Sequence, residues 1–188
     1  MKKPDIPKKL EKKIRQWLVY VGILFILVLI ILLFNIDIVG VITIIILMII
    51  ASFSKIYKRF TGTLSLGFEL VTPVTILFAY KISILFSLVA AFIMLMVASF
   101  IAGKIDFPSM TAEMITYLIL AILTAGMRGF DFVTVAVIMV FLRNIIMYPM
   151  GIIFLGRNFI HLLIVVVTDA FFNVLIVVGT GNFIASLL

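Results

Sequence analysis

Residues 82–102 read ISILFSLVAAFIMLMVASFIA, a stretch without a single charged side chain. A helix rises about 1.5 Å per residue, so an apolar segment of this length crosses the roughly 30 Å hydrocarbon core of a bilayer. The whole chain has a similar character, because 65% of its 188 residues are hydrophobic and 12% are charged. This balance excludes a water-soluble enzyme and a disordered chain, and it predicts an integral membrane protein.

Six further hydrophobic segments surround this stretch. They lie at about residues 17–34, 38–53, 64–80, 114–127, 132–155 and 159–178, and the longest polar loop between them is expected at 103–113. The sequence therefore predicts an all-α polytopic membrane protein, a bundle of six to seven transmembrane helices. We expect four parts: a basic cytoplasmic amphipathic segment (1–16), a transmembrane hairpin anchor (17–53), a helical-bundle core (62–178) and an apolar tail (179–188).

The N-terminal segment is rich in lysine. A helix there would place apolar side chains on one face and basic ones on the other, which is typical of contact with an anionic membrane surface. The residues expected at that surface are Lys8, Lys9, Lys12, Lys13, Arg15 and Trp17. No aromatic or glycine pattern supports nucleic-acid binding.

The distribution of basic residues predicts the orientation. If the N-terminus is cytoplasmic and the segments alternate, every Lys and Arg lies on the inner side except Lys81, Arg128 and the intramembrane Arg143. Such a bias follows the positive-inside rule. We therefore expect a multi-pass protein of the cell membrane with a cytoplasmic N-terminus.

Three charged residues inside hydrophobic segments stand out, Glu69, Arg143 and Asp169, because each costs about 2.5–3.5 kcal/mol on insertion scales. Arg143 lies near the middle of its segment, so we expect it to face the bundle interior and meet a carboxylate or a bound anion. The alternative is a structural ion pair that locks helix packing. The residues predicted to bind a ligand are Arg143, Glu69, Asp169, Asn173, Asn144 and Thr72.

The surroundings of the two acids suggest roles for them. Pro73 removes the amide that would bond to the Glu69 carbonyl, so the helix is expected to be weakest there. Alternatively, Glu69 reaches the interface and pairs with a loop cation. Asp169 and Asn173 are spaced i, i+4 and share a helix face, and with His161 they could form a proton path. The alternative is an interhelical hydrogen bond from Asp169 to Arg143 or to a threonine of the segment at 64–80.

Small residues recur along 82–102 within a narrow stripe. They are Ser83, Ser87, Ala91, Ala98 and Ala102. Small side chains let another helix approach closely, whether from this chain or from another protein.

Sequence signatures of catalysis and metal binding are missing. There is no phosphate-binding GxxxxGK[ST], GxGxxG, HExxH or GxSxG pattern, and the chain has no cysteine and one histidine. We therefore expect neither an enzyme nor a metal or cofactor site.

The core resembles the small membrane subunits of the MreD type and the substrate-binding S-components of energy-coupling-factor transporters. The resemblance rests on Leu66-Gly67-Phe68-Glu69-Leu70, on the small-residue stripe, and on Thr168, Asp169 and Asn173 in the last segment. It implies about six spans and a role inside a larger assembly. The first hydrophobic segment departs from S-components because it has no alanine.

Three functional hypotheses remain at this point. The first is a small-solute-binding transport component, with a polar site between the segments at 64–80, 132–155 and 159–178 in which Arg143 orients an anionic group. The second is a non-catalytic membrane scaffold of the MreD type. The third is a proton- or ion-conducting bundle. The expected partners are the lipid bilayer, other membrane protein subunits and a small-molecule solute.

Overall fold

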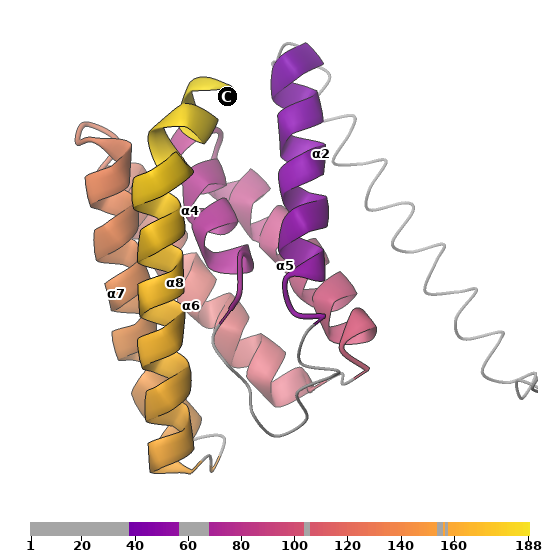
Figure 1. Cartoon of the computed structure of the whole chain (residues 1–188), viewed down its shortest axis with the longest axis vertical. Coiled ribbons are helices and arrows are strands. Elements are labelled where there is room, and N and C mark those ends of the chain that lie inside the picture. Colours follow the sequence, from indigo (N-terminus) through magenta and orange to yellow (C-terminus); the bar gives the residue numbers. More distant parts are fainter. Residues whose placement is uncertain (1–37, 57–67, 104–105, 154–155, 157) are drawn as a thin grey trace, which may run out of the picture. The chain divides into compact units, whose positions relative to one another are not determined.

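The computed structural model describes residues 38–56, 68–103, 106–153, 156 and 158–188. Within these ranges every regular element is an α-helix (Figure 1). The helices are α2 (Ile38–Phe53), α4 (Val71–Lys81), α5 (Ile84–Ile101), α6 (Phe107–Gly126), α7 (Phe132–Ile153) and α8 (Phe159–Ser186). The predicted all-α class therefore holds for the described part of the chain.

Four of these helices, α5 to α8, are long and apolar enough to cross a membrane. Helix α2 has 16 residues and α4 has 11, so both are shorter than these four. The predicted count of six to seven spans is not confirmed. Several apolar helices are nevertheless consistent with an integral membrane protein.

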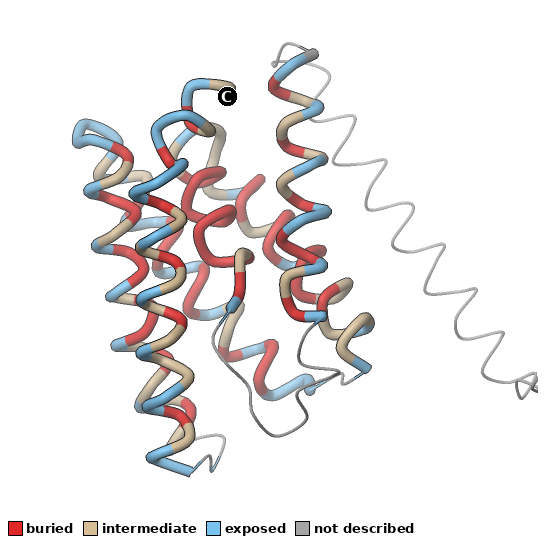
Figure 2. The backbone as a smooth tube through the Cα atoms, in the orientation of Figure 1, coloured by how far each residue is buried: buried red, intermediate tan, exposed pale blue. Residues whose placement is uncertain are grey.

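Short helix α4 is the centre of the bundle and contacts α2, α5, α6, α7 and α8. Its residues from Val71 to Ala79 are all buried, and Figure 2 shows this helix as almost continuously buried. A helix that is apolar on every side is suited to such a central position.

The start of α4 corrects the prediction of one continuous helix over 64–80. The helix begins at Val71, and Glu69 precedes it. Pro73 explains this limit, because proline lacks an N–H group and is tolerated only in the first turn of a helix. Residues 64–67 lie outside the described ranges.

The polar loop predicted at 103–113 is mostly helical. Asp106 accepts a hydrogen bond from the backbone N–H of Ser109 (3.4 Å), and Pro108 occupies the first turn of α6. An N-cap aspartate followed by proline is a strong start signal, so α6 begins well before the predicted residue 114.

The last helix is longer than predicted. Helix α8 continues past Val178 to Ser186, so the apolar tail expected at 179–188 is mostly part of it. The predicted first hydrophobic segment and its basic extension lie outside the described residues. The surface residues concerned are Lys8, Lys9, Lys12, Lys13, Arg15 and Trp17.

The small-residue stripe of α5 lies partly at close helix contacts within the chain. Ser87, Ala91 and Ala98 are fully buried, and α5 packs on α2, α4 and α6. Ser83 precedes the helix, where its hydroxyl accepts a hydrogen bond from the N–H of Phe86, and Ala102 follows the last turn.

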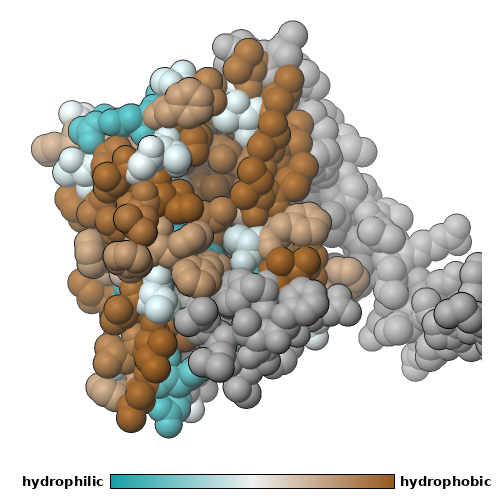
Figure 3. Space-filling view, viewed as in Figure 1, coloured by the Kyte–Doolittle hydropathy of each residue, from teal (hydrophilic) through white to brown (hydrophobic). Residues whose placement is uncertain are grey.

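The outward faces of the long helices are apolar. Phe171 and Phe183 of α8 are 68% and 69% exposed, and hydrophobic side chains dominate the surface in Figure 3. Such surfaces are unfavourable in water and suit contact with lipid.

Candidate functional site

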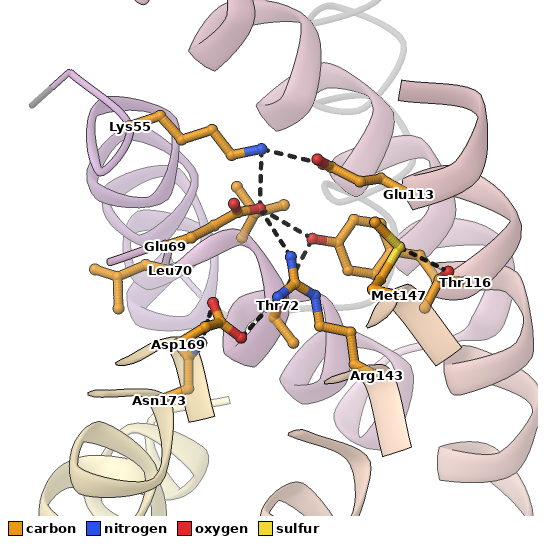
Figure 4. Close-up of polar contacts among 12 residues, drawn as sticks. Lys55, Glu69, Leu70, Thr72, Glu113, Thr116, Arg143, Met147, Asp169 and Asn173 are labelled. Carbon is orange, nitrogen blue, oxygen red and sulfur yellow. Dashed lines mark hydrogen bonds and ion pairs between the residues drawn. The ribbon is translucent and has the colours of Figure 1, made fainter. Parts of the chain in front are cut away.

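Five charged side chains meet in the interior of the bundle (Figure 4). We call them the charge cluster: Lys55, Glu69, Glu113, Arg143 and Asp169. Lys55 follows α2, Glu69 precedes α4, and the other three lie on α6, α7 and α8. The most exposed side chain of the five, that of Glu113, is only 14% accessible. Charges at this depth stay ionised only when they pair with one another.

Arg143 joins two carboxylates from different parts of the chain. Its Nη1 donates to Oδ2 of Asp169 at 2.6 Å, and its Nη2 lies 3.6 Å from Oε1 of Glu69. The first contact is a short charge-assisted hydrogen bond, whereas the second is longer than a hydrogen bond. The sequence-based expectation that Arg143 faces the interior and meets a carboxylate is confirmed.

Lys55 extends the charge cluster toward α6. Its Nζ lies 2.9 Å from Oε1 of Glu69 and 3.0 Å from Oε2 of Glu113. Burial disfavours the ammonium form, but the charges of Glu113 and Glu69 more than offset this effect, so the pKa of Lys55 is raised above its ordinary value. The positive-inside prediction places Lys55 among the cytoplasmic cations, and in the structure its side chain is buried inside the bundle.

Uncharged polar groups complete the hydrogen bonding. The Tyr117 hydroxyl donates to Oε1 of Glu69 (3.3 Å) and lies 3.2 Å from the hydroxyl of Thr72. Asn173 donates through Nδ2 to Oδ1 of Asp169 (3.0 Å). These contacts fix the orientation of both carboxylates.

The charge cluster lies in the bundle interior, next to the end of α2 and the start of α4. The Ser54 hydroxyl accepts a hydrogen bond from the N–H of Leu70 at 3.0 Å, which links the residue after α2 to the start of α4. Arg143 and Asp169, by contrast, are in the middle of α7 and α8. The site is thus formed by two interrupted elements packed against continuous helices.

Most of the predicted ligand-binding residues lie together. Arg143, Glu69 and Asp169 belong to the charge cluster, Asn173 contacts it, and Thr72 reaches it through Tyr117.

Asn144 lies next to the charge cluster, where its side chain interacts with Asp169, whereas His161 lies farther away. Asn144 donates through Nδ2 to the carbonyl of Val140 (3.1 Å), and its side chain lines a groove between α7 and α8. His161 lies near the start of α8, about 12 Å along the helix axis from Asp169.

Sequence reasoning missed Lys55, Glu113 and Tyr117. Glu113 and Tyr117 are spaced i, i+4 and therefore share a face of α6, a signal that was hidden because Glu113 was assigned to a loop. Nothing in the local sequence marks Lys55 as buried, because it sits beside other basic residues after a hydrophobic segment.

The described residues contain no group of three His, Cys, Asp or Glu side chains able to hold a metal ion. The side chains of the charge cluster form ion pairs and hydrogen bonds, and carboxylates of this kind can exchange protons.

Comparison of the chain with protein-family models, curated proteins and solved structures finds no match.

Proposed function

We propose that this chain is a small-solute-binding component of a membrane transport assembly, and that the charge cluster is its polar site. The observation that carries this proposal is the position of α4. With 11 residues, α4 covers only about 16 Å, roughly half of a bilayer core. Its N-terminus opens at the charge cluster, opposite the middle of α7 and α8.

Transporters commonly bind substrates near the bilayer midplane, where discontinuous helices end and irregular backbone lines the site. Glu69 and Leu70 are such irregular residues, directly before α4. Buried charges at this position cost stability, and a binding role accounts for their presence. The geometry therefore supports a site for a charged solute.

The unequal contacts of Arg143 favour an acidic solute. Its bond to Asp169 is tight at 2.6 Å, whereas its approach to Glu69 is loose at 3.6 Å. Glu69 also pairs with Lys55, so it can leave Arg143 without losing its charge partner. A carboxylate or phosphate of the solute would replace Glu69 at Nη2, where the guanidinium offers a second hydrogen bond.

The test is to identify what the protein carries. The wild-type chain is purified in mild detergent beside Arg143→Lys and the matched variant Arg128→Lys, which changes an arginine outside the charge cluster. Bound small molecules are then released and identified by mass spectrometry. We expect an acidic solute with the wild type and Arg128→Lys, and at least a tenfold loss with Arg143→Lys, since lysine keeps the charge but loses the planar fork.

The outcome that contradicts the proposal is equal retention of the solute by Arg143→Lys, or no acidic solute in any sample. Circular dichroism and gel filtration show whether all three proteins are folded. A protein that co-purifies without any solute would instead support the scaffold function.

A second candidate, proton transfer, is favoured by the continuity of the contacts. Glu113, Lys55, Glu69, Arg143 and Asp169 follow one another at separations of 2.6–3.6 Å. Proteoliposomes containing a pH-sensitive dye and driven by a potassium diffusion potential test it. Proton flux that disappears with Asp169→Asn would support this candidate, and the absence of flux would exclude it.

A further inference from the structure

Helices α7 and α8 line an open groove of about 660 Å³. We call it the α7–α8 groove. Phe141, Asn144, Ile145 and Tyr148 of α7 line it together with residues of α8 between Leu163 and Leu175. Its volume lies in the range of small-molecule sites, about 300–1,000 Å³.

Two residues that line this groove each carry a buried polar atom without a hydrogen-bond partner. The atoms are Oδ1 of Asn144, a residue that is only 4% exposed, and the hydroxyl of Tyr148. The amide nitrogen of Asn144 already donates to Val140, so the carbonyl oxygen is the free end. The two residues are spaced i, i+4 and share a face of α7. Buried groups without a partner are rare in native proteins and call for an explanation.

Neighbouring residues on α7 and α8 line the groove and form the charge cluster. Arg143 and Asp169 pair inside the cluster, whereas the next residue on each helix, Asn144 and Ala170, lines the groove. A ligand in the groove would therefore touch residues adjacent to the ion pair.

We propose that the α7–α8 groove binds an uncharged lipid-like molecule that carries a hydroxyl group. None of the described residues that line the groove is charged, and apolar side chains form most of its wall. The Asn144 oxygen only accepts hydrogen bonds, so the ligand must supply a donor, and a hydroxyl can also accept from Tyr148. The stretch from Leu163 to Leu175 extends about 18 Å along α8, enough for a hydrocarbon tail.

The free carbonyl argues against a transmembrane helix as the occupant. A helix satisfies its backbone N–H groups internally and therefore has no main-chain donor to offer. A lipid hydroxyl carries its own donor and reaches the groove directly from the bilayer.

The experiment uses two probes that differ only in the hydroxyl: dioleoylglycerol and its O-acetyl derivative. The full chain in detergent is incubated with each, and one-to-one adducts are measured by native mass spectrometry. We expect dioleoylglycerol to bind about tenfold more tightly than the acetylated probe, the effect of one hydrogen bond to a buried acceptor. Asn144→Leu should abolish this preference.

Three variants complete the test. Tyr148→Phe keeps the ring, which packs edge-on against Phe159, and should reduce the preference. Ala170→Leu should fill the groove and weaken the binding of both probes. Arg128→Lys lies outside both the groove and the charge cluster and should leave binding unchanged.

Equal binding of the two probes by the wild type would overturn the proposal, as would the absence of any adduct. A dimer that Ala170→Leu disrupts, without lipid adducts, would also overturn it and assign the groove to a second copy of the chain.

Discussion

Arg143 of α7 and Asp169 of α8 form a buried ion pair, with 2.6 Å between Nη1 and Oδ2. The pair joins the middle of two long helices that pack along each other. Burying this pair costs desolvation free energy. Further contacts offset that cost, because Asn173 donates a hydrogen bond to Asp169 and Glu69 lies near Arg143. The pair therefore locks α7 to α8 and positions the polar site at once.

Removing one partner of this pair should be costly. We expect Arg143→Met to reduce the free energy of unfolding by about 3–5 kcal/mol, because Asp169 is left charged and buried. The double variant Arg143→Met with Asp169→Asn should lose less free energy of unfolding, since no uncompensated charge remains at that pair. Urea unfolding in detergent measures both, and a double variant less stable than the single one would contradict this account.

The stability supplied by Lys55 should depend on pH. Its pKa in the folded protein is raised above 10.5, so the stabilisation is fully present below that pH and is lost as the pH rises through the folded-state pKa. Lys55→Met should therefore be less stable than the wild type at neutral pH, and the difference should shrink at strongly alkaline pH. A constant difference in melting temperature across this range would exclude the mechanism.

Arg128 should stabilise the end of α4. Its Nη2 donates to the carbonyl of Ala79 at 2.6 Å and to that of Ile82 at 3.3 Å. Arg128→Ala leaves these carbonyls to water, and because the arginine is exposed we expect a cost of only about 1 kcal/mol. Hydrogen exchange should become faster in the last turn of α4, while the exchange of α8 amides should not change.

Gly151 of α7 packs closely against the side chain of Leu162 in α8. A Cβ atom there would come within 2.5 Å of Cδ2 of Leu162. We expect Gly151→Ala to lower the melting temperature relative to Gly179→Ala, because Gly179 has open space around its Cα and alanine improves helix propensity there. Adding Leu162→Ala to Gly151→Ala should remove the clash, and no recovery in that double variant would argue against close packing as the cause.

Composition and local signals determined much of this protein. Long apolar segments predicted the helices from α5 to α8, because only a helix satisfies its backbone in lipid. Pro73 marked the weak point before α4, and Asp106 with Pro108 marked the start of α6. The interior position of Arg143 also followed from its sequence context, since a cation in the middle of an apolar segment must find a partner.

Tertiary structure alone decided which side chains meet. Lys55 and Glu113 are 58 residues apart in the sequence. Each lies just outside a predicted hydrophobic segment, a position where charged residues are common and do not indicate burial. Hydrophobic periodicity shows which face of a helix is buried but not which helix ends face one another. Only the packing of short α4 among the other helices brings the ends of α2, α4 and α6 to the middle of α7 and α8, and that arrangement creates the charge cluster.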